Sequence, residues 1–356
     1  MCCCFDCLYG SVLSIKHISN QFTFSQVTLQ GLKKVAAIFL LLLFAATADA
    51  QELFQQTEPA SNVPKNTLGI RAFGESYNEV GKLRNIFALR TMYGLTPKLT
   101  VMLTANVSNH HNKDLPPDFP VHNTPQIGIY HPYLFNGVDA YAKYRFLTID
   151  GKHSHFRMAL YGEYSYLNVA HDEAEPTLMD DTRGYGGGLI ATYLKNHLAV
   201  SFTGGFVVPT DYKGDVADAI AGLPTVPAVV KYGKGAVYDL SFGYLLFPHE
   251  YKSYEQTNWS LYLELMGKSY GGAQVFFGNI GSNLPIYEVS VKNTPVLHGY
   301  NYLEAWPGVQ CIIKSNLRVD FSMGFPLINK SYVHYYPIYM LGLQCYFYFN
   351  KKHSRR

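Results

Sequence analysis

Apolar and polar residues alternate along residues 338–349, close to the end of the chain. Every second residue from position 339 is apolar or aromatic: Tyr339, Leu341, Leu343, Cys345, Phe347 and Phe349. The opposite face carries Gly342, Gln344, Tyr346 and Tyr348. A period of two is typical of a β-strand, and one fully apolar face suits contact with lipid. This stretch therefore predicts a strand with one side toward a membrane.

The same alternation recurs along most of the chain. Further segments with this period are residues 68–76, 85–93, 99–107, 138–146, 156–166, 184–194, 198–206, 238–244, 259–265, 299–313 and 317–325. In each, one face is mainly apolar and the other carries small, polar or charged residues. About twelve strands with an apolar outside and a polar inside predict an all-β fold, an up-and-down transmembrane antiparallel barrel over residues 68–349.

Short and long connections alternate between these strands. Short turns are expected at residues 96–98, 149–152, 195–196, 248–256 and 314–316, and longer segments at 108–136, 168–183, 209–233 and 268–298. This alternation is typical of barrels with short periplasmic turns and long extracellular loops. An even strand count places both ends on the periplasmic side. Residues 285–292 also alternate, which leaves a loop hairpin or a further strand open.

Two places interrupt the strand pattern. Three glycines at residues 186–188 predict a bulge or a close contact inside the lumen. If Tyr300 and Tyr302 face lipid, Glu304 faces lipid too, which is unfavourable. Pro307 nearby then predicts a bulge that resets the register, or an edge near the membrane boundary.

The N-terminal region carries an export pattern. Lys33 and Lys34 precede an apolar run, residues 35–46, and Ala48-Asp49-Ala50 forms an A-x-A cleavage site before Gln51. These features predict a signal peptide over residues 32–50. The apolar run is shorter than the roughly 20 residues that a transmembrane helix needs.

Residues 1–31 fit neither a signal peptide nor a barrel. We interpret them as a mis-assigned N-terminal extension, with the true start near Leu32. A metal site at the cysteines of positions 2, 3, 4 and 7 is the alternative, but zinc sites require two spaced ligand pairs and no second pair lies nearby.

Composition narrows the class of protein further. The 29 Lys and Arg nearly balance the 26 Asp and Glu, so nucleic acid is not an expected partner. Tyrosine and phenylalanine are abundant, 29 and 22, against 2 tryptophans. Tyrosine suits a membrane interface because its ring is apolar and its hydroxyl is polar.

The polar faces of the predicted strands define candidate lumen-lining residues. They are Arg71, Glu75, Arg90, Asp139, Lys143, Arg145, Arg157, Glu163, Asp239, Glu264, Arg318 and Asp320. Acids and bases are about equal in number, which leaves open a mixed polar pore or an interior crossed by ion pairs. An inward position also follows simply because Arg or Lys facing the bilayer centre costs about 2–4 kcal/mol.

No residues suggest catalysis or a bound cofactor. Imidazole pairs at His110, His111 and His122, and at His153 and His155, resemble metal ligands, but solvated polar loops explain them more simply. The chain contains no G-x-S-x-G, P-loop or G-x-G-x-x-G before a helix. We therefore expect no cofactor, no metal and no enzyme activity.

Residues 338–349 resemble the closing strand of Gram-negative outer-membrane barrels. In those proteins alternate apolar residues and a terminal aromatic are read by the insertion machinery. The resemblance implies an insertion signal made of Tyr339, Leu341, Leu343, Phe347 and Phe349. It also implies the bacterial cell outer membrane as location, with outer-membrane lipid and the barrel-insertion machinery as partners. The basic C-terminal tail, residues 350–356, departs from the pattern, which ends at the aromatic.

Residues 90–104 contain Tyr-Gly-Leu-Thr at positions 93–96, a turn into a new strand. This stretch resembles the outer-membrane transporter family of the meta-pathway of phenol degradation. The resemblance covers about fifteen residues and the general layout. It implies passage of small aromatic or apolar molecules, and no residue role is carried over from it.

The sequence thus predicts an outer-membrane channel or transporter that passes an unknown small solute passively. The alternative is a closed barrel that serves as a structural or interaction scaffold through loops 108–136, 209–233 and 268–298. A soluble periplasmic β-protein fits the terminal strand poorly. The periplasmic N-terminal segment, residues 51–67, either enters the lumen as a plug or remains in the periplasm.

Overall fold

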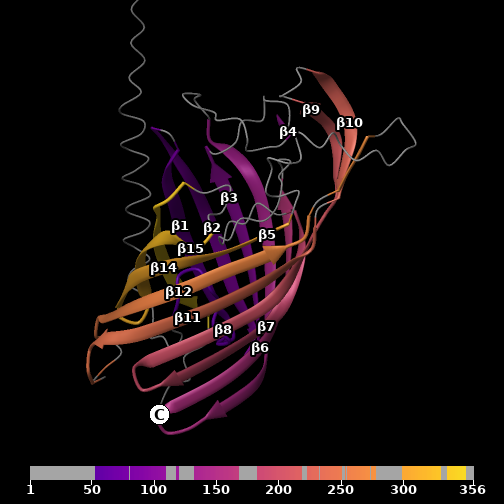
Figure 1. Cartoon of the computed structure of the whole chain (residues 1–356). Helices are drawn as coiled ribbons and strands as arrows, with labels where there is room; N and C mark the ends of the chain where they lie inside the picture. Colours follow the sequence, from indigo (N-terminus) through magenta and orange to yellow (C-terminus); the bar gives the residue numbers. More distant parts are fainter. Residues whose placement is uncertain are drawn as a thin grey trace, which may run out of the picture. The chain divides into compact units, whose positions relative to one another are not determined.

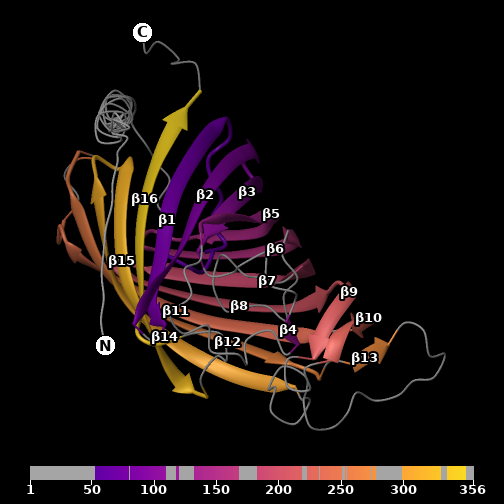
Figure 2. The same cartoon turned by 90° about the horizontal axis from the view of Figure 1, so that it is seen from above.

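The computed structural model describes residues 53–79, 81–109, 118–119, 132–167, 183–218, 223–231, 233–250, 253, 255–272, 274–277, 299–329 and 335–349. Twelve antiparallel strands of this part form a closed barrel (Figures 1 and 2). The predicted all-β antiparallel barrel is therefore confirmed. The predicted extension and signal peptide, residues 1–31 and 32–50, and the tail 350–356 lie outside the described residues.

Each barrel strand pairs with its neighbours in the order of the chain. The first six strands are β1 (Thr67–Glu79), β2 (Lys82–Thr96), β3 (Leu99–Ser108), β5 (Leu134–Asp150), β6 (Ser154–Leu167) and β7 (Gly184–Lys195). The other six are β8 (Leu198–Pro209), β11 (Gly235–Phe247), β12 (Asn258–Tyr270), β14 (Tyr300–Ile313), β15 (Leu317–Ile328) and β16 (Ile338–Tyr348). Pairing of β1 with β16 closes the ring and places Thr67 opposite Tyr348.

The long connections contain further strands. They are β4 (Asp118–Phe119), β9 (Tyr212–Asp218), β10 (Leu223–Lys231) and β13 (Gln274–Phe277). These form a separate sheet in the order β13-β10-β9-β4. The predicted loops 108–136, 209–233 and 268–298 therefore contain paired backbone, and residues 285–292 lie outside the described part.

The connections at the end where β1 begins and β16 finishes are mostly tight turns, and this end is called the short-turn end below. Lys314 and Ser315 have φ angles of 50° and 51°. Two consecutive residues in the left-handed region are typical of the two-residue turn that matches the twist of a hairpin.

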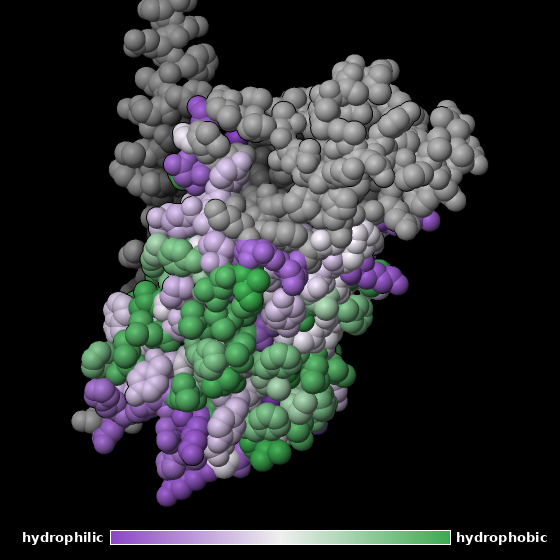
Figure 3. Space-filling view, in the orientation of Figure 1, coloured by the Kyte–Doolittle hydropathy of each residue, from purple (hydrophilic) through white to green (hydrophobic). Residues whose placement is uncertain are grey.

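The face of the barrel wall in view carries clustered apolar side chains (Figure 3), and exposed aromatic residues lie toward both ends of the wall. Exposed aromatics toward the short-turn end are Tyr144, Phe146, Tyr193, Tyr244, Phe247 and Trp259; toward the other end they are Tyr133, Phe135, Tyr164, Tyr166, Tyr185 and Phe206. Eight residues separate Tyr185 from Tyr193 along β7, or about 26 Å of strand. With the usual strand tilt this approaches the roughly 25 Å apolar band of outer-membrane barrels.

On β14 the side chains that the sequence could place toward lipid point into the barrel instead. Tyr302, Glu304 and Trp306 are 1%, 0% and 0% exposed and lie inside the barrel. The premise that Tyr302 and Glu304 face lipid is therefore wrong. The register of β14 against β15 shifts between Leu303 and Glu304, so a bulge does lie near Pro307. Inside the barrel, Glu304 accepts hydrogen bonds from Trp306 Nε1, at 3.0 Å, and from the Tyr336 hydroxyl.

The glycine-rich stretch of β7 makes room for an aromatic ring in the lumen. A Cβ at Gly188 would lie 2.8 Å from the Tyr161 ring, and one at Gly205 would lie 2.2 Å from the Tyr161 hydroxyl. Residues 186–188 therefore mark a close contact inside the barrel, which is one of the two explanations left open by the sequence.

Because the outer face of the barrel contacts lipid, a charged side chain placed on it should destabilise the folded protein. Leu103, on the outer face of β3, is 52% exposed, and Leu83, at the rim of β2, is 62% exposed. We expect Leu103→Arg to lower the free energy of unfolding in lipid vesicles by about 2–4 kcal/mol, and Leu83→Arg to lower it by at most about 1 kcal/mol. Urea titrations of vesicle-folded protein measure both values. Equal costs at the two positions would contradict the assignment.

Candidate functional site

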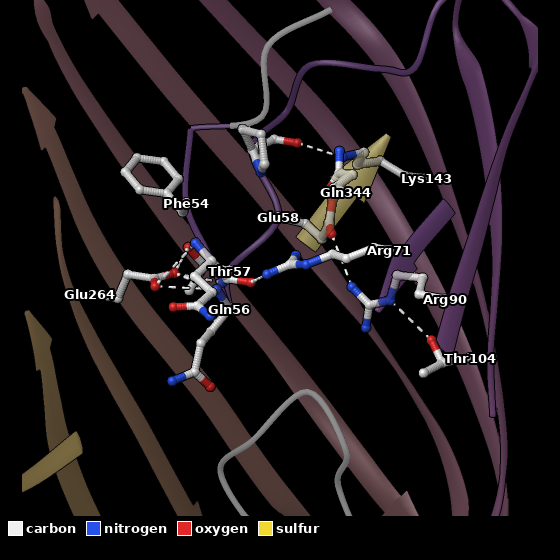
Figure 4. Close-up of polar contacts among 12 residues, drawn as sticks. Phe54, Gln56, Thr57, Glu58, Arg71, Arg90, Thr104, Lys143, Glu264 and Gln344 are labelled. Atoms are coloured by element: carbon white, nitrogen blue, oxygen red, sulfur yellow. Dashed lines mark hydrogen bonds and ion pairs between the residues drawn. The ribbon is translucent and has the colours of Figure 1, made fainter. Parts of the chain in front are cut away.

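The segment before β1 lies inside the barrel and contacts many of the inward-facing side chains. We call residues 53–66 the plug (Figure 4). The plug contacts β2 through Gly94 and reaches Glu264 of β12, which lies on the other side of the β1–β16 closure. The sequence left open whether the N-terminal segment enters the lumen or remains in the periplasm. Residues 53–66 enter the lumen.

Glu264 holds one end of the plug through consecutive backbone groups. Its carboxylate accepts hydrogen bonds from the backbone N–H of Gln55, Gln56 and Thr57, at 3.3, 3.0 and 2.7 Å. It also accepts one from the Thr57 hydroxyl at 2.9 Å. Successive N–H groups that converge on one point favour an anion. Glu264 is fully buried, so these donors replace the water that an ionised carboxylate would otherwise need.

Two arginines hold the carbonyl groups of the same stretch. Arg71 of β1 donates to the Gln55 carbonyl, and Arg318 of β15 donates to the Phe54 carbonyl. Arg318 also pairs with Asp320 at 2.7 Å. The backbone N–H groups of residues 55–57 and the carbonyls of residues 54 and 55 are therefore matched by opposite groups from β1, β12 and β15.

Glu58 forms the charged centre of the plug. Its carboxylate lies 3.2 Å from Arg90 Nη1 and 3.0 Å from Lys143 Nζ, and Lys143 also donates to the Pro59 carbonyl at 2.6 Å. Burial alone would raise the pKa of the Glu58 carboxyl, but the charges of Lys143 and Arg90 outweigh it and hold the pKa below its ordinary value. Glu58 is therefore an ionised anchor between β2 and β5.

Hydroxyl groups bind the middle of the plug. Thr192 of β7 accepts from the Ala60 backbone N–H at 2.8 Å. Thr100 of β3 accepts from the Val63 N–H at 3.0 Å. Arg157 of β6 donates to the Ser61 hydroxyl at 3.0 Å. These contacts attach the plug to three further strands, so its hydrogen bonds are distributed around the barrel wall.

Gly94 allows the end of the plug to approach β2. A Cβ at this position would lie 2.0 Å from the Pro64 carbonyl oxygen. Lys65 forms an isolated bridge with Gly94, and the Asn66 N–H donates to the Gly94 carbonyl at 2.8 Å. The glycine of the Tyr-Gly-Leu-Thr stretch thus marks the place where the plug meets the wall.

The predicted lumen residues fall into four groups in the structure. Arg71, Arg90, Lys143, Arg157, Glu264 and Arg318 contact the plug directly. Asp320 and Glu75 are buried, and Asp320 pairs with Arg318. Asp139, Glu163 and Asp239 are partly exposed interior residues, whereas Arg145 lies at the short-turn end and donates to the Pro97 carbonyl.

Solvent access to the interior is uneven. Phe73, Tyr77, Trp306, Ile338 and Met340 pack together in a buried cluster that involves β1, β14 and β16. Across from them, on β5, β6 and β11, interior residues are partly exposed: Asp139, Tyr141, Tyr161, Glu163 and Asp239. The β5–β11 side is therefore where water reaches the barrel interior beside the plug.

Several residues of the site could not be recognised from the sequence. Thr100 and Thr192 read as ordinary strand residues, and Thr57 and Glu58 as a polar linker. The signal that could have found them is the concentration of polar groups and one carboxylate directly before a strand whose inward face carries Arg71. His155, which the sequence offered as a metal ligand, pairs with Asp150 at 2.7 Å. No group of three metal-ligating side chains lies together within the described residues, and His110, His111 and His122 lie outside them.

Comparison with known proteins supports the fold. No family model and no curated protein matches the chain. The structure is similar to that of the COG4313 outer membrane channel from Pseudomonas putida F1, with a TM-score of 0.50 and 13% identity, over 85% of this chain and 100% of that one. At this identity the likeness shows a shared fold, that of an outer-membrane barrel.

Two further solved structures are more distant. The β domain of the Bordetella autotransporter BrkA matches with a TM-score of 0.36 and 11% identity, over 80% of this chain and 99% of that one. Salmonella typhi OmpF matches with a TM-score of 0.30 and 8% identity, over 79% and 97%. The resemblance to the phenol meta-pathway family stays a prediction.

The Glu264 contacts predict how firmly the plug is held. Glu264→Gln leaves a single oxygen acceptor where the carboxylate now accepts four donor groups. Each such charge-assisted bond contributes about 1.5–3 kcal/mol. In a chain that starts at Gln51 and carries Cys311→Ala and Cys345→Ala, a Gln56→Cys thiol is the single cysteine, and it reports release because Gln56 is 1% exposed. We expect Glu264→Gln to raise its rate of maleimide labelling at least tenfold, and the exposed control Glu255→Gln to leave it unchanged.

The Glu58 ion pairs predict a response to acid. Because the pKa of seated Glu58 is lowered, the ionised carboxylate stabilises the plug fully above the ordinary glutamate pKa of about 4.3. That stabilisation is lost as pH falls through the lowered value. Maleimide reacts with the thiolate, whose fraction falls with pH, so each rate is divided by that of the urea-unfolded protein at the same pH. We therefore expect this ratio at position 56 to rise only below about pH 4, and Glu58→Gln to give a high ratio at all pH values. Acceleration between pH 7 and 5 that depends on Glu58 would contradict this.

Proposed function

We propose that the protein is an outer-membrane channel for passive passage of a small solute, closed in this structure by the plug. The observation that carries the proposal is the seat of residues 53–66, which lie within the barrel and are held by polar groups from many strands. The chain carries no nucleotide-binding motif, so the proposal invokes no energy source.

The chemistry of the seat supports a movable plug. Many of its contacts are hydrogen bonds and ion pairs, and its apolar packing comes from four separate side chains, Leu53, Phe54, Ala60 and Val63. Hydrogen bonds to the wall exchange for hydrogen bonds to water, so each contributes about 0.5–1.5 kcal/mol net when both partners are neutral and about 1.5–3 kcal/mol when one is charged. A segment held in this way can leave and return, whereas an apolar core cannot.

For the solute we propose a small aromatic or apolar molecule. The resemblance of residues 90–104 implies this class, and the interior surface agrees with it. Tyr141 and Tyr161 stack with ring centroids 5.3 Å apart on the partly exposed side. The similar solved structure is described as an outer membrane channel, which supports the same role here.

A closed scaffold is the second candidate. The sheet built from β4, β9, β10 and β13 favours it, because paired strands give the long connections a defined surface for a partner. The buried cluster around Phe73 and Met340 also fills part of the interior. The scaffold requires no movement of the plug, so a test of plug movement separates the two candidates.

A reversible cross-link tests the channel. The hydroxyl oxygens of Thr57 and Ser241 lie 2.7 Å apart, so Thr57→Cys with Ser241→Cys places two sulfurs within bonding reach. We propose this pair in a Cys311→Ala, Cys345→Ala background, starting at Gln51, in a planar bilayer. The oxidised protein should be silent, and reduction should restore discrete conductance steps and uptake of small aromatic solutes into vesicles.

Each single cysteine variant is the matched control and should not respond to reductant. A correctly folded barrel lacking residues 53–63 is the second test, because it removes all of the plug except the three residues that lead into β1. If that variant neither conducts ions nor admits aromatic solutes, the channel is overturned and the scaffold stands.

A further inference from the structure

Three neighbouring turns at the short-turn end each carry an exposed lysine. Lys98 lies between β2 and β3, Lys152 between β5 and β6, and Lys195 at the end of β7. The strands β2, β3, β5, β6, β7 and β8 are consecutive neighbours in the barrel. The three side chains therefore follow one arc of the rim, which we call the lysine arc.

The lysine arc lies directly beyond exposed aromatic side chains of the outer wall. Tyr144 and Tyr193 are 47% and 43% exposed. Tyr144 pairs with Leu99, the residue after Lys98, and Tyr193 precedes Lys195 by two positions. Aromatic rings of this kind mark the level of the lipid headgroups. The ammonium groups therefore lie where headgroup phosphates would be.

The charge of this part of the rim is positive. Asp150 is the acidic residue of the described turns here, and it is engaged by His155 at 2.7 Å and Arg157 at 3.7 Å. Arg145 adds a further positive group, bonded to the Pro97 carbonyl at 2.9 Å. The turn between β11 and β12 differs, because its described part carries Glu250 and Glu255.

We infer that the lysine arc binds the headgroups of anionic phospholipids in the leaflet at the short-turn end. Each lysine has an apolar stem that can run along the wall while its ammonium reaches a phosphate. The attraction is electrostatic and acts near the surface, so it fades as salt shortens the Debye length. Such binding would fix the depth of this arc in the bilayer, and it does not depend on whether the barrel conducts.

Brominated lipids measure this directly because they quench only an indole that they touch. Tyr193→Trp in a Trp259→Phe background places a reporter beside Lys195, while the remaining Trp306 is 0% exposed and lies inside the barrel. We expect brominated phosphatidylglycerol to be preferred over brominated phosphatidylcholine about fivefold at low salt, the factor that corresponds to ~1 kcal/mol per basic residue. In 0.5 M salt the preference should fall toward one.

The matched controls decide between the arc and a general charge effect. Lys98→Gln with Lys152→Gln and Lys195→Gln should abolish the preference at position 193, whereas Lys82→Gln with Lys234→Gln should leave it intact. The native Trp259, beside the turn that carries Glu255, should show little preference. An undiminished preference in the triple variant, or an equal one at position 259, would overturn the inference. Heat-modifiable mobility on gels confirms that every variant is folded.

Discussion

Closure of the strand ring is the constraint on which the rest of the structure depends. In hydrocarbon no water satisfies a backbone N–H or carbonyl, so a sheet survives there only if it has no free edge. Pairing of β1 with β16, from Thr67–Tyr348 to Ser76–Tyr339, removes that edge. Once the ring is closed, alternation along every strand separates two environments, and the charged residues in the middle of the strands, such as Arg71, Arg90 and Glu264, are directed inward.

The inward residues then create a second problem, which the plug answers. Arg71, Arg318 and Glu264 are almost fully buried, and buried charges are costly without partners. The plug supplies partners for these three from its backbone, and Glu58 does the same for Arg90 and Lys143. The Phe73 and Trp306 side of the interior is packed with apolar groups. Wall and plug therefore complement each other in polarity, and the interior holds a seated segment rather than a uniform water column.

The sequence predicts the wall far better than its contents. Period-two alternation determines the strands because a one-residue slip would expose an entire polar face to lipid, so the twelve barrel strands and their tight turns are readable. The inward position of Tyr302 is not, because a tyrosine suits either face of a barrel. The partners of Glu264 and Glu58 escape prediction for another reason: backbone N–H groups and threonine hydroxyls look alike at every position, and only the fold decides which of them converge.

The route of the plug has a mechanical consequence. Leu53 packs near Leu194 and Ala199 beside the β7–β8 turn, and Lys65 bridges to Gly94 beside the β2–β3 turn. The segment therefore enters and returns at one end of the ring and can be withdrawn without threading a free end through it. A pull from that side would load its contacts one after another, as in opening a zipper. The resisting force would then be set by the strongest single contact, not by the sum of them all.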